Sequence, residues 1–248
     1  MSMGRFFLPR KQIDGTLGKI DGPELAHLRK VLRLKPGDRI TVFDDTGWEH
    51  EAVIVSVAGA QGNIEIIRSY QVQRESPLHL TLAVGLTKGE KIDFVVEKAT
   101  ELGAQAIIPF ASRYAVPKLD ERKIAARCER WRKIAMSATK QCGRVAVPDV
   151  VPLMSFADLL ARAQPETAKL LCWEKEGEQS LRQAHDKLRD AKALLLVVGP
   201  EGGMSPSEAE LARQNGFERV HLGRRILRAE TAAITALSLA QFLWGDLA

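Results

Sequence analysis

A glycine-rich turn between Val197 and Glu210 is the first place where this sequence could do chemistry. It reads VVGPEGGMSPSEAE and sets Gly199, Gly202 and Gly203 between an aliphatic run and a helix start. Glycine lets another molecule approach the main chain closely, and it also adopts positive φ at little cost. The turn is therefore expected to bind a small molecule through its backbone. A tight connection without a ligand would need the same residues.

The residues after the glycines predict a rigid support for this turn. Ser205 is expected to be a helix N-cap, Pro206 the first helical residue and Glu208 the reciprocal partner of a capping box. A phosphate-binding loop requires a lysine and a hydroxyl after the glycines, and a dinucleotide fingerprint requires GxGxxG, so neither matches. A neutral or zwitterionic small molecule remains as the expected ligand.

A second turn, VHLGRRILRAETA, concentrates charge in a comparable place. Arg224, Arg225 and Arg228 stand beside Glu230, between a short strand that ends at Gly223 and an apolar helix. Such residues often form surface ion pairs of little energetic value. A charged turn between a strand end and a helix start is, however, a usual position for functional residues.

The elements that must position these turns are strands alternating with helices. Strands are expected at 78–86, 104–112, 169–176, 193–199 and 220–223, and helices at 91–103, 122–143, 206–216 and 230–244. This alternation predicts an α/β domain with a parallel sheet. Ligands of such sheets bind at the carboxyl ends of the strands, where both turns fall.

The first ~70 residues have a different pattern, typical of a small β-barrel with one short basic helix. Alternating apolar and polar residues occupy 39–45, 50–59 and 63–72, and a polar stretch at 73–77 ends the pattern. The expected domains are therefore 1–73 and 77–248. The basic helix, which contains Arg29, Lys30 and Arg33, is either a solvated face or a contact for an anionic partner.

Composition places this chain of 248 residues among folded proteins, with 45% hydrophobic and 27% charged residues and a net charge of +5. No apolar run approaches the roughly 20 residues of a membrane span, and the N-terminus has no secretory pattern, so a cytoplasmic location without membrane contact is expected. Cys128, Cys142 and Cys172 are expected to be free thiols. The five histidines have no ligand spacing, and no metal is expected.

Both turns resemble the S-adenosylmethionine (SAM) binding motifs of the SPOUT methyltransferases, and specifically those of the RsmE family, which methylates N3 of a uridine in 16S ribosomal RNA. The relevant stretches are GPEGG with its following SPSE, and LGRRILRAETA before the last helix. RFFL at 5–8, HLRKVLRLKPGD at 27–38, TELGAQAIIPF at 100–110 and QCGR at 141–144 extend the resemblance over essentially the whole chain.

The resemblance implies a PUA-like β-barrel followed by a SPOUT α/β domain with a deep C-terminal trefoil knot. It also implies a homodimer with the last helix in or near the interface, and SAM as the co-substrate. Carried over by position, the cofactor-binding residues are Cys172, Trp173, Glu174, Gly199, Pro200, Glu201, Gly202, Gly203, Leu222, Gly223, Ile226, Leu227, Arg228 and Thr231. Leu222, Ile226 and Leu227 would flank the adenine, and Trp173 would either stack on a base or be a core or surface tryptophan.

The chemistry of the implied acceptor suggests two catalytic residues. The N3–H of uracil is a weak acid, so its proton must leave and the resulting charge must be stabilised. Arg228 is expected to stabilise this charge, and Glu230 to position Arg228 or accept the proton; the alternative for Glu230 is a helix cap. Expected RNA-binding residues are Arg5, Arg29, Lys30, Arg33 and Arg113, with Arg130, Arg132 and Arg144 extending the surface.

Three other functions are compatible with parts of the pattern. The chain could act on another RNA such as transfer RNA, which methylated nucleoside in that RNA would reveal. It could be a non-catalytic RNA-binding or assembly factor, which would fail to bind SAM. A nucleotide-hydrolysing enzyme is disfavoured by the missing phosphate-binding loop.

Overall fold

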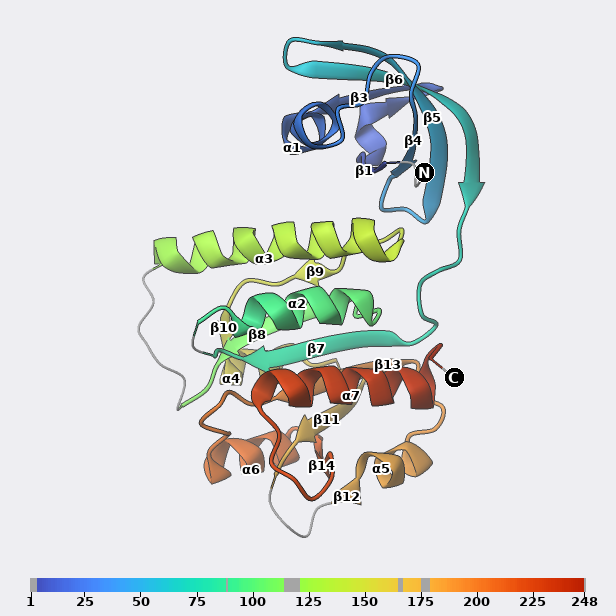
Figure 1. Ribbon diagram of the computed structural model, residues 1–248. Coiled ribbons are helices and arrows are strands. Elements are labelled where there is room, and N and C mark those ends of the chain that lie inside the picture. Colours follow the sequence, from blue (N-terminus) through green and yellow to red (C-terminus); the bar gives the residue numbers. More distant parts are fainter. Residues whose placement is uncertain (1–3, 88, 114–120, 165–166, 175–178, 248) are drawn as a thin grey trace. The chain divides into compact units, whose positions relative to one another are not determined.

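The computed structural model describes residues 4–87, 89–113, 121–164, 167–174 and 179–247 (Figure 1). The chain forms two compact units. The first contains the residues up to Glu75 together with Thr139–Val147, and the second contains Ser76–Ala138 and Pro148 onward. The last turn of a long helix and the segment after it therefore belong to the N-terminal unit.

The first unit is built on one six-stranded sheet with the order β1-β4-β5-β6-β3-β2. Its strands are β1 (Arg5–Phe7), β2 (Ile13–Asp14), β3 (Leu17–Asp21), β4 (Arg39–Phe43), β5 (Trp48–Ala58) and β6 (Gln61–Gln71). Among the described strands of this unit, β1 and β4 are the only parallel pair. The alternation in β4, β5 and β6 directs apolar side chains such as Ile40, Ile54 and Ile64 into a buried core, so the three predicted strands are confirmed.

The predicted basic helix consists of two short turns. Helix α1 (Gly22–Ala26) continues into a π-helical turn, η2 (His27–Val31), and a short 3-10 turn, η1 (Arg10–Gln12), precedes both. Leu25 and Leu28 pack into the core, which leaves the basic residues of η2 on the outside. Arg33 follows with φ of 54°, an uncommon conformation for a residue with a side chain.

Charged residues connect the segment Thr139–Val147 with the rest of the first unit. Glu75 accepts hydrogen bonds from Arg144 Nε at 2.8 Å and from the backbone N–H groups of Val145 and Ala146. Arg5 pairs with Glu49 at 3.1 Å and donates to the Arg144 carbonyl at 2.8 Å. We refer to Arg5, Glu49, Glu75 and Arg144 as the internal ion-pair cluster.

The second unit contains an eight-stranded sheet in which every described pairing is parallel, as predicted. The order is β10-β8-β7-β13-β11-β14-β12, with β9 beside β8. The strands are β7 (His79–Gly85), β8 (Ala106–Ala111), β9 (Asp149–Val150), β10 (Met154–Ser155), β11 (Ala168–Cys172), β12 (Gln179–Ser180), β13 (Ala193–Val198) and β14 (Glu218–His221). The expected strand at 169–176 ends at Cys172, and its positions 175 and 176 lie outside the described residues.

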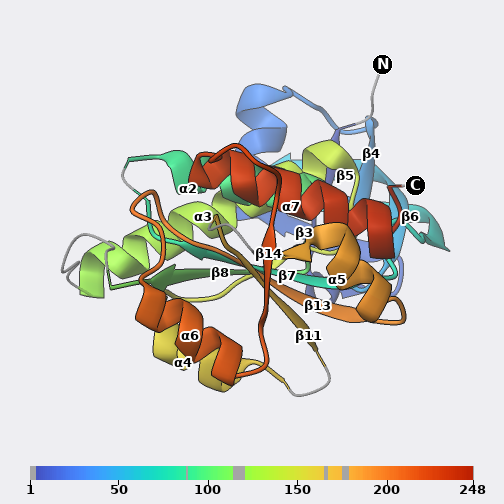
Figure 2. The ribbon, with the colours of Figure 1, turned by 90° about the horizontal axis from the view of Figure 1, so that it is seen from below.

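Helices cover both faces of this sheet. The helices of the second unit are α2 (Lys91–Glu101), α3 (Glu121–Cys142), whose last turn belongs to the first unit, α4 (Phe156–Arg162), α5 (Leu181–Lys187), α6 (Pro206–Gln214) and α7 (Ala229–Trp244). Helices α2 and α7 lie on one face, and α4 and α6 lie on the other (Figure 2). The sequence pattern did not predict α4 and α5, because seven residues are too few for a clear helical period. None of the described helices combines the length and the apolar character that crossing a membrane requires.

Candidate functional site

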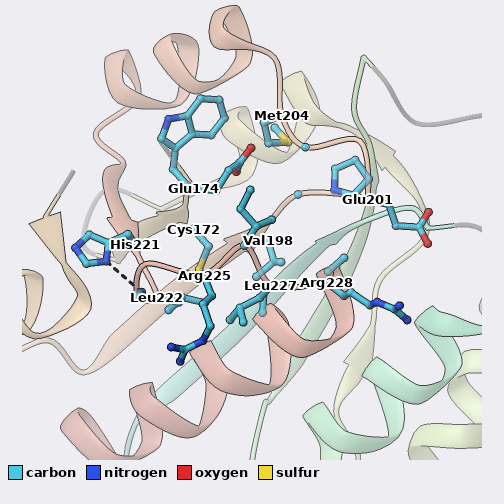
Figure 3. Close-up of a pocket in the computed structure, with 18 of the residues that line it drawn as sticks. Cys172, Glu174, Val198, Glu201, Met204, His221, Leu222, Arg225, Leu227 and Arg228 are labelled. Atoms are coloured by element: carbon cyan, nitrogen blue, oxygen red, sulfur yellow. Dashed lines mark hydrogen bonds between the residues drawn. The ribbon is translucent and has the colours of Figure 1, made fainter. Parts of the chain in front are cut away.

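A cavity of about 460 Å³ lies where three neighbouring strands of the second unit end. Strands β13, β11 and β14 are adjacent and parallel, so their carboxyl ends meet at one edge of the sheet. The loops after these strands contain the predicted site residues. Those that line the cavity are Cys172, Trp173, Glu174, Gly199, Pro200, Glu201, Gly203, Leu222, Gly223, Ile226, Leu227 and Arg228 (Figure 3).

The glycine turn packs closely against its neighbours. The Gly203 N–H donates to the Pro200 carbonyl at 2.8 Å, and Gly203 has φ of 70°. A Cβ at Gly203 would also lie 3.1 Å from Glu174 Oε1. At Gly85, the last residue of β7, a Cβ would lie 2.5 Å from Pro200. The absence of a side chain at Gly85 therefore allows the glycine turn to pack against the end of β7. Sequence reasoning missed Gly85, because only the strand register brings it to the turn.

The predicted capping box after the turn is confirmed. Ser205 Oγ accepts the Glu208 N–H at 3.2 Å, and Glu208 Oε2 accepts the Ser205 N–H at 2.8 Å. The other oxygen of Glu208 accepts the backbone N–H of Arg113 at 2.7 Å. The start of α6 therefore fixes the end of the glycine turn and also the main chain after β8.

The wall of the cavity is largely apolar. Figure 3 shows Cys172, Val198 and Leu222 clustered in its middle, while Glu201 and Arg228 extend toward one side. Trp173 is 4% exposed and belongs to the apolar core between the sheet and helices α4 and α6, which matches the core alternative considered for it. Ile226, in contrast, is 84% exposed.

Burial determines the state of the thiol in this wall. Desolvation raises the pKa of Cys172 to about 12. Only the thiolate is a strong nucleophile, so at neutral pH this cysteine contributes a neutral, apolar surface.

The third loop is shaped by a histidine that the sequence did not indicate. His221 Nδ1 accepts the Gly223 N–H at 3.1 Å, and Gly223 has φ of 119° (Figure 3). An accepting Nδ1 puts the proton of a neutral imidazole on Nε2. His221 therefore supports the turn that leads into Arg224 and Arg225, both of which line the cavity.

Charged groups meet at the edge of the cavity beside α7. Arg228 is the N-cap residue of α7 through its backbone, without a capping bond from its side chain. Lys91, the first residue of α2, lines the cavity and donates a hydrogen bond to Glu201. Its Nζ also lies 3.8 Å from Glu230 Oε2.

Three predicted site residues do not line the cavity. Gly202, Glu230 and Thr231 are absent from the described lining, although each is next to a residue that belongs to it. The Glu230 side chain is 17% exposed. Among the described residues, no hydrogen bond joins Glu230 to Arg228, and the cation that pairs with the Glu230 carboxylate is Lys91, at 3.8 Å.

The predicted RNA-binding residues fall into two groups. Arg29, Lys30, Arg33 and Arg113 have exposed side chains, and Arg29 donates to the Gly59 carbonyl at 2.8 Å. Arg5 instead belongs to the internal ion-pair cluster, with its side chain 13% exposed.

Arg144 was predicted to extend the RNA-binding surface. The structure corrects this prediction, because Arg144 is 5% exposed and paired with Glu75. Arg130 and Arg132 are exposed, but each is ion-paired with acidic neighbours. In the part of the chain that the structure describes, no group of His, Cys, Asp or Glu side chains is arranged to hold a metal ion.

Comparison with known sequences agrees with both units. A family model described as an RNA methyltransferase domain matches residues 74–241, and one described as an RNA methyltransferase PUA domain matches residues 20–62. Ribosomal RNA small subunit methyltransferase E of Bacillus subtilis (strain 168) is 37% identical over 247 residues, which cover 97% of this chain and 96% of the relative. The protein of the same name from Synechocystis is 33% identical over 231 residues, which make up 93% of this chain and 74% of the relative.

Solved structures show the same likeness in three dimensions. Ribosomal RNA small subunit methyltransferase E from Neisseria gonorrhoeae, bound to SAM, superposes with a TM-score of 0.89 at 34% identity over the full length of both chains. A methyltransferase from Legionella pneumophila in complex with SAM gives a TM-score of 0.91 at 32% identity, also over both full lengths. The fold is that of an RNA methyltransferase with a PUA-like first unit and an α/β second unit. The chain belongs to the RsmE family, as its two motifs predicted.

Proposed function

We propose that this protein transfers the methyl group of SAM to N3 of a uridine in 16S ribosomal RNA. One observation carries the proposal. Both motifs meet around a single cavity, in a chain whose relatives are named ribosomal RNA small subunit methyltransferase E and include a member bound to SAM.

The cavity fits a ligand of this kind. Its volume of about 460 Å³ is within the range usual for small-molecule sites, and its wall combines apolar side chains with main chain freed by glycines. We propose that Leu222 and Leu227 contact the adenine, with Ile226 at the rim. The main chain from Gly199 to Gly203 would contact the rest of the cofactor, together with Cys172, Trp173 and Glu174. Thr231 would support the loop from behind, since it does not line the cavity.

The reaction forms a bond from N3 to the methyl carbon as the sulfonium–carbon bond breaks. SAM supplies an electrophilic methyl group and leaves as the neutral thioether, S-adenosylhomocysteine. The N3 proton goes to a base, and the negative charge that develops on the uracil requires stabilisation. In-line placement of N3 and the methyl group would contribute much of the remaining acceleration.

Arg228 is the proposed source of that stabilisation, because it lines the cavity and no capping bond holds its side chain. Glu230 is the proposed proton acceptor. Its Oε2 receives no hydrogen bond from the described residues and lies 3.8 Å from Nζ of Lys91, which lines the cavity, so its capacity to accept a proton is not used within the described fold. Glu230 is also the second residue of α7, where the helix dipole stabilises a negative charge. If Glu230 only stabilised the helix, its replacement would leave the rate of methyl transfer unchanged.

The remaining features of the proposal concern domains and assembly. Residues 1–73 would form the RNA-binding PUA-like barrel, and 77–248 the SPOUT domain, closed by a C-terminal trefoil knot. Phe94 of α2 and Leu239 and Phe242 of α7 are exposed, which supports a homodimer that buries this side. A ribosomal RNA substrate implies that the enzyme acts in the cytoplasm.

RNA contacts are proposed for the exposed basic residues Arg29, Lys30 and Arg33 of the first unit and for Arg113 of the second. Phosphate contacts position an RNA without reading its sequence. The choice of uridine would then depend on the shape of the ribosomal RNA around it.

Nucleoside mass spectrometry tests the proposal. Small ribosomal subunits that lack N3-methyluridine are incubated with the protein and SAM carrying an isotope-labelled methyl group. Labelled N3-methyluridine is the expected product, in assembled subunits or in naked 16S RNA. Its absence from both, with SAM binding intact, would refute the proposed substrate, and labelled nucleoside in transfer RNA would identify another RNA instead.

A further inference from the structure

Lys91 reaches the cavity from outside the three loops that the motifs define. It begins α2, which follows β7 in the sequence, yet it lines the cavity together with residues from the loops after β13 and β14. Its side chain is 37% exposed, so its stem is partly covered while its ammonium group stays near water. No motif in the sequence marked this residue.

The ammonium group of Lys91 lies between two carboxylates. It donates to Glu201 Oε1, in the glycine turn, and lies 3.8 Å from Glu230 Oε2, in the first turn of α7. The hydrogen bond to Glu201 is the main cause that raises the pKa of Lys91, and the charge of Glu230 acts in the same direction. Lys91 is therefore a permanent cation that bridges two of the cavity's loops.

The carboxylate of Glu230 depends on this cation for its placement. Glu230 Oε2 is buried without a hydrogen-bond donor among the described residues, and a buried anion needs a compensating charge. Arg228 is close enough to lower the pKa of Lys91 by repulsion, so the cavity edge carries two cations and two carboxylates. Charges balanced in this way are held in position before a substrate arrives.

We propose that Lys91 is a positioning residue for methyl transfer: it bridges Glu201 and Glu230, and so holds the Glu230 carboxylate where it can accept a proton from the substrate. This inference rests on the proposed function. Lys91 itself contacts neither the reacting nitrogen nor the methyl group in this scheme. It acts through the position of Glu230 and through the link between the glycine turn and α7.

The test compares Lys91→Met and Lys91→Arg with Lys98→Met. Lys98 is a matched control, because it belongs to the same helix, is 30% exposed and pairs with two carboxylates, Glu97 and Glu101, neither of which lines the cavity. Single-turnover methyl transfer to small subunits is measured at saturating SAM and RNA, and the SAM Kd is measured separately. The expected result is a rate about ten-fold lower for Lys91→Met, with the SAM Kd within about three-fold of the original protein. Lys91→Arg should stay within about three-fold of the original rate, and Lys98→Met should not differ.

A second measurement does not require activity. Amide hydrogen exchange of Gly203 and Ala232 reports on the two bridged segments, since these N–H groups donate to Pro200 and Arg228. Lys91→Met should accelerate both amides, and Lys98→Met should not. If the unmodified protein produces no N3-methyluridine, the proposed function fails and the exchange data alone decide whether Lys91 is a bridge.

Several results would overturn the role of Lys91. One is a Lys91→Met rate within two-fold of the original protein, and another is a loss confined to SAM affinity, which would make Lys91 a cofactor contact. Equal losses in Lys91→Met and Lys91→Arg would show that retaining the positive charge is not enough. Unchanged exchange at both amides would exclude the bridge itself.

Discussion

The internal ion-pair cluster of the first unit and the charged edge of the cavity in the second unit are both rich in arginine and glutamate. In the cluster, Arg144 and Glu75 meet each other and the nearby main chain, at distances of 2.6–3.2 Å. At the cavity edge the contacts are looser: Glu230 Oε2 lies 3.8 Å from Lys91 Nζ, and Arg228 forms no capping bond. Charges that find partners within the fold stabilise it, whereas charges placed around a cavity are available to a ligand.

The largest expected effect is on catalysis at the cavity edge. Arg228→Ala should lower the rate of methyl transfer by about 100-fold or more, as the loss of a charge-stabilising group does in other enzymes. The melting temperature should change little, because the Arg228 side chain does not cap α7. Single-turnover assays and calorimetric SAM titration provide the measurements, with Arg213→Ala on α6 as an exposed, ion-paired control. A rate within a few-fold of the original protein, with SAM still bound, would rule out this role for Arg228.

The opposite response is expected in the internal ion-pair cluster. Arg144→Ala leaves Glu75 without its main partner and should lower the free energy of unfolding by about 2–3 kcal/mol, with the SAM Kd unchanged. Urea unfolding provides the measurement. Arg132→Ala is the matched control, because its pair with Glu129 is exposed, and it should change stability by less than about 0.5 kcal/mol. Equal effects of the two substitutions would contradict a structural role for the cluster.

Charge reversal on the π-helical turn η2 should weaken RNA binding and leave SAM affinity unchanged. The double variant Arg29→Glu/Lys30→Glu is expected to weaken RNA binding on the order of 30-fold. The slope of log K against the logarithm of the salt concentration should become less steep by about 1.5–2. Arg213→Glu/Lys187→Glu carries the same change in net charge at other exposed sites and serves as the control. Filter binding over a salt series measures both quantities. A parallel loss of SAM affinity would mean that Arg29 and Lys30 support the fold.

The smallest expected effect separates backbone strain from ligand contact. Gly203 and Gly216 both have positive φ, 70° and 82°, but only at Gly203 would a Cβ have a neighbour within 4 Å. Alanine should therefore cost similar stability at each position, about 1 kcal/mol, while Gly203→Ala alone weakens SAM binding by about ten-fold. Thermal unfolding and calorimetric titration measure the two effects. Equal SAM affinities in the two variants would remove Gly203 from the proposed site.

Local patterns in the sequence predicted much of the second unit and of the candidate site. Patterns within short stretches predicted the alternation of strands and helices and the capping box at Ser205. They also predicted that the two motif turns lie at the same edge of the sheet. Lys91 and Gly85 were missed because the order of the strands in the sheet, and no spacing along the chain, brings Lys91 to the cavity and Gly85 to the glycine turn. His221 belongs to the second motif turn, but nothing in the sequence indicated its hydrogen bond with Gly223.

The same limit explains the arginines of the first unit. A run of basic residues suggests an exposed surface, and this held for Arg29, Lys30 and Arg33. The inward position of Arg144 depends on Glu75, which is 69 residues away in the sequence, so no local pattern could have indicated it. Arg5 has comparable internal partners, and its contact with RNA stays a prediction.

A crystal structure of the protein with S-adenosylhomocysteine would test the central claim most directly. The adenosine is predicted to occupy the cavity formed by the three loops, against Leu222 and Leu227, with main-chain contacts from the turn Gly199–Gly203. The sulfur should face the edge that carries Arg228 and Lys91. A ligand bound at another place, or one that leaves the glycine turn untouched, would contradict the account.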